Sequence, residues 1–176
     1  AKKLGIENIF VSTDCDVISK IGSSYAAHHI KRPPELATPD SLTEDVLVHA
    51  YKEIIKIKGR PEIIVLLFAN NPAISTKLVS EGIEKLLKDN SYDSAFSVSK
   101  YNMFSPARAR KIIDEKIESF VPLHLIDNVS SIRSSQGDVY FCDLSVQIIR
   151  SRVFENMKDG MQPFQWMGKK SYPCFL

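Results

Sequence analysis

The chain contains one short and strongly apolar run, residues 62–68 (EIIVLLF), which restricts its fold more than any other segment. Turn-forming residues bound the run on both sides, Gly59-Arg60-Pro61 before it and Ala69-Asn70-Asn71-Pro72 after it. Because the run is short and rich in branched residues, it predicts a central strand that is buried on both faces. Apolar residues at helical spacing predict a helix on each side of it: Val46, Leu47, Ala50, Ile54 and Ile57 before it, and Leu78, Val79, Ile83, Leu86 and Leu87, capped by Ser75, after it.

Two further segments extend this alternation of strands and helices. Residues 7–13 (ENIFVST) predict a buried strand, Asp14 would cap the helix that follows, and residues 93–100 (DSAFSVSK) predict another strand. Strand-helix-strand units in series favour parallel strands joined by right-handed crossovers, so the sequence predicts an α/β fold. The pattern then changes to shorter β-like pieces at 111–113, 117–121 and 138–142.

Composition argues against several classes of protein. With 176 residues, of which 44% are hydrophobic and 25% charged, the chain suits one globular domain with a sizeable core, and two small domains are the alternative. The net charge of +2 is too small to argue for nucleic acid, and no apolar run approaches the ~20 residues of a membrane span. The three widely spaced cysteines fit neither zinc spacing nor a disulfide framework, so we expect a reduced, cytoplasmic compartment.

Polar segments lie at the ends of the predicted strands, at residues 12–14, 69–72, 100–110 and 135–137. Ligands of open parallel sheets bind outside the carboxyl ends of the strands, so we expect these segments to line one edge of the sheet. Within them, Asn70 and Asn71 offer amide donors and acceptors that suit a nucleobase or a sugar. A simple turn is the alternative, since asparagine and proline favour turns on their own.

Arg32 precedes two prolines in the segment Arg32-Pro33-Pro34-Glu35-Leu36-Ala37. Adjacent prolines fix the backbone and bias the preceding residue toward an extended conformation, so Arg32 would be presented from a stiff loop. A hydroxyl and acidic run, residues 40–45 (DSLTED), then opens a helix. An arginine held beside a helix N-terminus is suited to an anionic ligand, and we therefore expect phosphate or carboxylate binding here.

Charged residues near the other predicted strand ends are further candidates. Arg108 and Arg110 alternate, so on extended backbone both would face one side and could clamp a carboxylate or phosphate; an ordinary basic strand edge is the alternative. Asp138 enters a strand as an isolated carboxylate and could bind a metal or a hydroxyl, although a turn-capping aspartate is the favoured interpretation. A core or interface role is expected for the aromatic residues near the end of the chain: Phe164, Trp166, Tyr172 and Phe175.

Several of these segments together resemble the acylneuraminate cytidylyltransferases, the CMP-sugar synthetase family. The most specific matches are IFVSTD at 9–14 and RPPELATPDSLTEDVLVHA at 32–50, which are similar to the family's STD and RPxELA…S…HA segments. VLLFANNP at 65–72, SPAR at 105–108 and SQGDVYF at 135–141 match further family segments, and FxNxP and YNMxSPxRAR features indicate an atypical subgroup.

The resemblance implies a three-layer, mostly parallel sheet of the nucleotide-diphospho-sugar transferase type. It places Arg32 and Thr43 at the nucleotide, and it places Arg108 and Gln136, where the family has a lysine and an asparagine, near the acceptor sugar. Asn70 and Asn71 would hold the nucleotide or the adjacent sugar. Phe68 replaces a family glutamine that helps to hold the sugar acid, so the acceptor need not be N-acetylneuraminate.

The activity that the resemblance implies is transfer of CMP from CTP to a sialic-type sugar acid, with release of pyrophosphate, by a homodimer that uses Mg²⁺. The family's glycine-rich phosphate loop and its metal-binding Asp-x-Asp motif are not in this sequence, and we expect the domain formed by residues 1–176 to be incomplete at both ends. Two alternatives stay open: a non-catalytic sugar-nucleotide binding domain, and a nucleotidyltransferase for another acid sugar such as Kdo.

Overall fold

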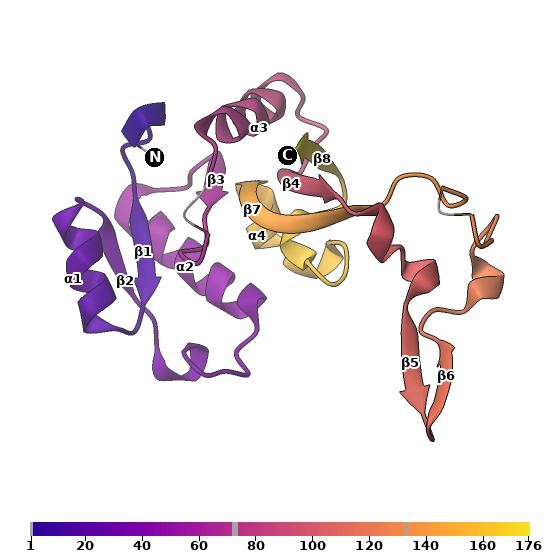
Figure 1. Ribbon diagram of the computed structural model, residues 1–176. Helices are drawn as coiled ribbons and strands as arrows, with labels where there is room; N and C mark the ends of the chain where they lie inside the picture. Colours follow the sequence, from indigo (N-terminus) through magenta and orange to yellow (C-terminus); the bar gives the residue numbers. More distant parts are fainter. Residues whose placement is uncertain (1, 72–73, 133) are drawn as a thin grey trace.

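The computed structural model describes residues 2–71, 74–132 and 134–176, so Pro72 of the predicted Asn70-Asn71-Pro72 turn lies outside the described residues (Figure 1). The helices are α1 (Asp16–Ser24), α2 (Thr43–Lys58), α3 (Thr76–Lys88) and the short α4 (Ser151–Glu155). The strands are β1 (Phe10–Thr13), β2 (His28–Lys31), β3 (Ile63–Leu66), β4 (Ser94–Lys100), β5 (Arg110–Ile113), β6 (Lys116–Ser119), β7 (Tyr140–Arg150) and β8 (Ser171–Phe175). Among the described helices, none is long and apolar enough to cross a membrane.

A four-stranded mixed sheet forms the centre of the molecule, in the order β3-β7-β4-β8. Strand β7 runs antiparallel to both of its neighbours, β3 and β4, whereas β4 and β8 are parallel. A parallel pair, β1-β2, and an antiparallel hairpin, β5-β6, lie apart from this sheet. The α/β fold is therefore confirmed, but the three-layer, mostly parallel sheet that the resemblance implied is not.

The position predicted for the strongest apolar run is wrong. Strand β3 is an edge strand among the described pairings, because β7 is its single partner. Its two faces are nevertheless both covered, since Ile64 and Leu66 pack against one hydrophobic cluster while Ile63 and Val65 pack against the other. When both faces of a strand are apolar, the sequence shows no alternation and does not indicate which strands lie beside it.

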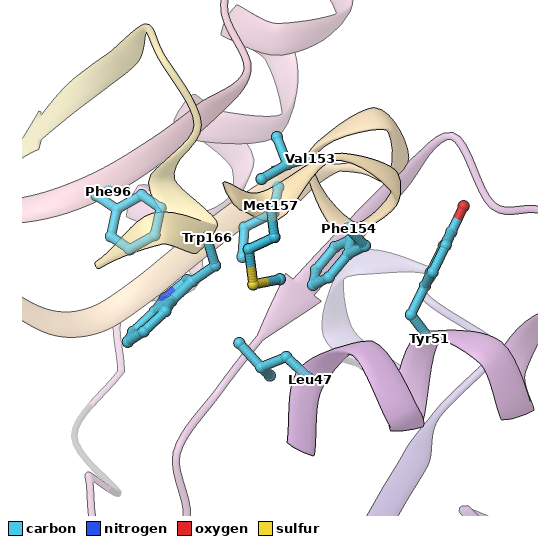
Figure 2. Packing of buried hydrophobic residues seen from close by; sticks show 8 residues of the cluster. Leu47, Tyr51, Phe96, Val153, Phe154, Met157 and Trp166 are labelled. Atoms are coloured by element: carbon cyan, nitrogen blue, oxygen red, sulfur yellow. The ribbon is translucent and has the colours of Figure 1, made fainter. Parts of the chain in front are cut away.

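Two hydrophobic clusters cover opposite faces of the mixed sheet. The first joins Leu47 and Tyr51 of α2 to Phe96 of β4 and to Trp166 (Figure 2). The indole nitrogen of Trp166 donates 2.8 Å to Oε1 of Gln147, so its polar atom is satisfied inside the core. Of the four aromatic residues expected in a core or interface, Phe164 packs beside Trp166 and Tyr172 packs against the second cluster, whereas Phe175 is exposed.

The second cluster fixes α3 close to the sheet. Leu78, Val79 and Leu86 of the helix pack on Ala95, Val146 and Ile148 of the strands. Gly82 lies where the helix approaches most closely, since a Cβ atom built there would be 2.2 Å from Cδ1 of Ile148. The predicted helix of 75–87 is confirmed, with Ser75 as the residue before its first turn, although the side chain of Ser75 makes no capping hydrogen bond.

The β1-β2 pair was only half predicted. Strand β1 matches the predicted segment, but β2 (sequence HHIK) was missed because a run with three polar residues of four carries no strand pattern. The expected cap at Asp14 is also wrong. Helix α1 begins at Asp16, and the backbone amide of Cys15 donates 3.1 Å to Oγ1 of Thr13.

The segment between β4 and β7 leaves the body of the molecule, and the β5-β6 hairpin projects from it (Figure 1). Ile112 of β5 and Ile117 of β6 face each other across the hairpin and are 78% and 77% exposed. The predicted pieces at 111–113 and 117–121 therefore exist as strands, but the hairpin contributes no residue to either hydrophobic cluster.

Candidate functional site

Arg32 is held at the carboxyl end of β1. Its backbone amide donates 3.1 Å to the carbonyl oxygen of Thr13, and Nη2 of its guanidinium donates 2.9 Å to the carbonyl oxygen of Ser12. Two polar atoms here, Nε of Arg32 and Oγ of Ser12, are buried without a hydrogen-bond partner among the described residues. A buried polar group without a partner costs about 1–3 kcal/mol, so this end of β1 favours a polar ligand.

Thr43 begins α2, and the loop that leads to it is held by side-chain hydrogen bonds. Oγ of Ser41 donates 3.1 Å to the carbonyl oxygen of Glu35 and accepts the backbone amide of Thr38 at 3.1 Å. Thr43 is half-buried and is the first residue of the helix. The two residues predicted to contact the nucleotide, Arg32 and Thr43, are therefore the two ends of one ordered loop.

Asn71 is tied to β7 rather than presented as an isolated amide. Its Nδ2 donates 2.6 Å to Oγ of Ser145, and its backbone amide donates 3.2 Å to the carbonyl oxygen of Phe68 in a turn. Asn70 is exposed, and no side-chain hydrogen bond joins it to another described residue. The turn interpretation accounts for Asn71, and Asn70 keeps its amide available for a ligand.

Sequence reasoning missed Asp143, which organises an irregularity between β4 and β7. Phe96 pairs with Gln147 and Val98 with Cys142, so β7 has extra residues here, and Leu144 among them has a φ of 59°. The Asp143 carboxylate accepts the hydroxyl of Ser97 at 2.5 Å. The strand alternation of β7 is interrupted where the carboxylate replaces regular backbone pairing.

Three donors keep the Asp143 carboxylate ionised. Burial alone would raise its pKa, but hydrogen bonds from the Ser97 hydroxyl, the Ser145 amide and the Ser99 hydroxyl together lower the pKa below its ordinary value. The Ser145 amide and the Ser99 hydroxyl lie 2.9 Å and 2.8 Å from its oxygens. A single acidic residue in the apolar stretch 139–149 is the signal that could have drawn attention to it.

A pocket of about 330 Å³ brings together Arg108 and Gln136, the two residues predicted to lie near the acceptor sugar. Arg110 lines the same pocket. The remaining lining residues are hydroxyl or apolar: Ala107, Leu123, Val129, Ser130 and Ser131. Among the described residues this lining holds two arginines and no carboxylate, so the pocket is suited to an anion.

The local backbone places the two arginines in the pocket by a different route from the predicted one. Arg108 ends a 3-10 turn (Pro106–Arg108), whereas Arg110 begins β5, so they do not alternate along one extended segment. Nη1 of Arg110 donates to the carbonyl oxygens of Ala107, at 3.0 Å, and Ala109, at 2.9 Å. Arg110 thus holds the turn that carries Arg108.

Gln136 reaches the pocket with its amide nitrogen already engaged. Nε2 donates 3.2 Å to the carbonyl oxygen of Asn128 and also donates to Oγ of Ser135. Both amide protons are used, which leaves Oε1 as the atom that can accept a hydrogen bond from a ligand.

Asp138 is paired with a lysine and an asparagine. Lys100 Nζ lies 2.7 Å from its Oδ1, and Nδ2 of Asn102 donates 3.0 Å to the same oxygen. The bond from Lys100, followed by that from Asn102, lowers the pKa of Asp138 below its ordinary value. No group of three or more histidine, cysteine, aspartate or glutamate side chains gathers in the described ranges. Asp138 instead links the end of β4 to the start of β7.

The predicted convergence of four strand-end segments is seen for two of them, 100–110 and 135–137, whose residues share the first pocket. Asn71 meets β7 at Ser145, and Lys100 meets Asp138, while Arg108 and Gln136 share the pocket. A second hollow of about 300 Å³ adjoins this region and is lined by Tyr101, Phe104, Phe141 and Asp143. The fourth segment, residues 12–14, forms its own cluster with Arg32 at the end of β1.

Comparison with known proteins gives the chain a family relationship. It is 29% identical over 97 residues to N-acylneuraminate cytidylyltransferase A of Danio rerio, a match that covers 55% of this chain. It is 24% identical over 160 residues, 91% of the chain, to N-acylneuraminate cytidylyltransferase of Oncorhynchus mykiss. The chain is related to the cytidylyltransferases.

The sequence matches cover only a fraction of the length of each cytidylyltransferase relative. The matched segments span 21% of the length of the Danio rerio protein and 34% of that of the Oncorhynchus mykiss protein. No family model matches the chain.

The cytidylyltransferase fold is also found in a solved structure. CMP:2-keto-3-deoxy-manno-octonic acid synthetase complexed with CTP aligns over 98% of this chain and 74% of that chain, with a TM-score of 0.60 and 13% identity. The likeness establishes a nucleotidyltransferase fold for the chain.

Proposed function

We propose that this chain is the substrate-binding part of a cytidylyltransferase that transfers CMP from CTP to a sialic-type sugar acid and releases pyrophosphate. The observation that carries the proposal is that Arg108 and Gln136 line one pocket, whose described lining holds two arginines and no carboxylate. The relationship to N-acylneuraminate cytidylyltransferases supports the same conclusion.

In this reaction a hydroxyl oxygen of the acceptor attacks the α-phosphorus of CTP, loses its proton and forms the new P–O bond as the bond to pyrophosphate breaks. Such a transfer depends mainly on positioning and on compensation of phosphate charge. Arg108 would hold the carboxylate of the sugar acid through its planar fork of donors. Oε1 of Gln136 would accept a hydrogen bond from a hydroxyl or amide of the same sugar.

Arg32 and Thr43 would hold the nucleotide at the end of β1. The buried Nε of Arg32 has no partner among the described residues and would gain one from a phosphate or ribose oxygen. Asn70, which is exposed after β3, would contact the nucleotide or the adjacent sugar, while Asn71 would position this turn through Ser145. Mg²⁺ and a cytoplasmic location follow from the resemblance and from cysteine usage, and they stay predictions.

A homodimer is part of the proposal, with the β5-β6 hairpin as its contact. Two observations support this role for the hairpin: it projects from the body, and its facing isoleucines, Ile112 and Ile117, are almost fully exposed (Figure 1). An isolated two-stranded hairpin is marginally stable in water, so a second copy packed against these side chains would stabilise it.

The test is pyrophosphate release by the full-length protein from CTP across a panel of sugar acids that includes N-acetylneuraminate and 2-keto-3-deoxy-manno-octonate. We expect release that requires both CTP and one of the acids. CTP or CMP-sugar binding without turnover by any acid would favour the alternative of a non-catalytic sugar-nucleotide binding domain. Turnover with the octonate alone would support CMP transfer as the reaction but would replace the sialic-type acid by the octonate as the acceptor.

A further inference from the structure

We propose that the acceptor carries a second anionic group in addition to its carboxylate, and that Arg110 recognises this second group. The inference rests on the proposed function, because it concerns the same acceptor pocket. A phosphate ester and a second carboxylate share the required chemistry, namely a planar or tetrahedral set of anionic oxygens that a guanidinium can bind through two donors.

The two guanidinium groups of the pocket each offer a separate binding edge. Arg110 uses Nη1 for the carbonyl oxygens of Ala107 and Ala109, which fixes the side chain and leaves its Nε and Nη2 edge for a ligand. Arg108 is exposed and forms no side-chain hydrogen bond to another described residue, so its whole fork remains. One carboxylate engages one such edge in two parallel hydrogen bonds, and two edges therefore suit two anions.

The charge of the pocket also favours a ligand with more than one anionic group. The described lining includes no acidic residue, so a monoanionic ligand would leave one guanidinium without a compensating charge.

The uncharged residues that line the pocket indicate the size of the ligand and the chemistry of the part between its charged groups. Oε1 of Gln136 accepts, whereas the hydroxyls of Ser130 and Ser131 can donate, and Leu123 adds an apolar surface. This set matches a polyol with an amide or hydroxyl between its two charged ends. A volume of about 330 Å³ is at the lower end for small-molecule sites, which suits one sugar rather than a sugar nucleotide.

Calorimetry of the full-length protein in the absence of CTP tests this inference. The probes are N-acetylneuraminate and 2-keto-3-deoxy-manno-octonate, each with and without a phosphate ester on its terminal hydroxyl, at one ionic strength. Near neutral pH such an ester carries close to two negative charges. We expect the ester to bind about ten- to a hundredfold more tightly than the same sugar without it, as for charge-assisted hydrogen bonds.

Arg110→Gln should remove most of this preference, because it should weaken binding of the ester more than binding of the unphosphorylated sugar, whose carboxylate Arg108 holds. Lys111→Gln removes the same charge from the neighbouring exposed residue outside the pocket, and it should retain the preference. Thermal unfolding of each variant separates a loss of the turn held by Arg110 from a loss of ligand contact.

Three results would overturn the inference: equal affinity of the wild-type protein for both forms of a sugar, an equal loss for both forms in Arg110→Gln, or no binding of any probe. An equal loss would assign Arg110 to the first carboxylate or to the turn alone. Because CTP is absent, a failure of CMP transfer does not decide the binding result, and the two proposals can fail separately.

Discussion

In the sheet body, residues 94–98 of β4 and 146–150 of β7 are buried, whereas most residues between 101 and 139 are exposed. Packing fixes the first region. The second is held by hydrogen bonds, such as those from Arg110 to Ala107 and from Gln136 to Asn128, and it contains the pocket lined by Arg108, Arg110 and Gln136. The comparison teaches that the buried core and the pocket lined by arginines occupy different parts of this chain, so we expect stability and ligand recognition to be separable.

The largest expected effect on stability is in the body. Phe96→Ala should lower the free energy of unfolding by about 3–5 kcal/mol, because a fully buried aromatic ring is replaced by a cavity. Leu125→Ala, at a residue of the other region that is 73% exposed, should change it by less than about 0.5 kcal/mol. Denaturant unfolding measures both. Similar losses of unfolding free energy in the two variants would contradict the claim that packing in the sheet body provides most of the stability.

Asp143 lies at the border between the two regions, and Asp143→Asn should cost about 1–3 kcal/mol because hydrogen bonds to a charged acceptor are lost. The pKa of Asp143 is lowered in the folded protein, so its contribution is present above the ordinary carboxyl pKa and is lost as the pH falls through the lowered value. Stability of the wild type should therefore decline in acid more than that of the variant. Parallel pH profiles would show that the carboxylate is not held as described.

The double variant Ile112→Ser and Ile117→Ser tests whether the projecting hairpin serves association of two copies rather than stability of the fold. Because neither side chain belongs to a hydrophobic cluster, we expect the sheet body to stay folded while the proposed dimer dissociates. Analytical ultracentrifugation measures the mass, with Lys111→Gln as the control on the same strand. A double variant with an unchanged mass in solution would exclude the hairpin as the contact.

A small effect is expected at the link between α2 and α4. Glu155 accepts from Tyr51 at 2.6 Å and pairs with Arg60 at 2.6 Å, and the Arg60 bond, followed by that of Tyr51, lowers the pKa of Glu155 to about 2. Its contribution is present above the ordinary glutamate pKa and is lost as the pH falls through about 2. The pair is exposed, so Glu155→Gln should cost less than about 1 kcal/mol at neutral pH. A loss of several kcal/mol in thermal unfolding would contradict this.

The sequence predicted the elements whose pattern is local. Helical spacing located α2 and α3, and the segment 93–100 became β4 at Ser94–Lys100. It could not indicate that β3 lies at an edge, because a strand with two apolar faces carries no information about its neighbours. Strand β7 extends to Arg150, well beyond the predicted 138–142, because its polar interruption at Asp143 is satisfied by serines of β4.

The candidate site was predictable to a smaller extent. The proximity of Arg108 to Gln136 came from the resemblance to the cytidylyltransferases, since the two residues are separated by a long stretch of exposed chain. Arg108 and Arg110 were predicted to face one side because they alternate along extended backbone. Both do line one pocket, but Arg108 belongs to a 3-10 turn, so extended backbone is not what brings them together. Asn71 was predicted as a ligand contact, and its bond to Ser145 depends on a tertiary contact that no local pattern encodes.

The central claim is that Arg108 holds the carboxylate of the acceptor, and steady-state kinetics of Arg108→Gln in the full-length protein tests it most directly. Loss of a charge-assisted hydrogen-bonded pair should raise KM for the sugar acid about ten- to a hundredfold, with KM for CTP unchanged. Lys111→Gln should leave both constants at their wild-type values. An unchanged KM for the acid, or an equal rise for the acid and for CTP, would contradict the account.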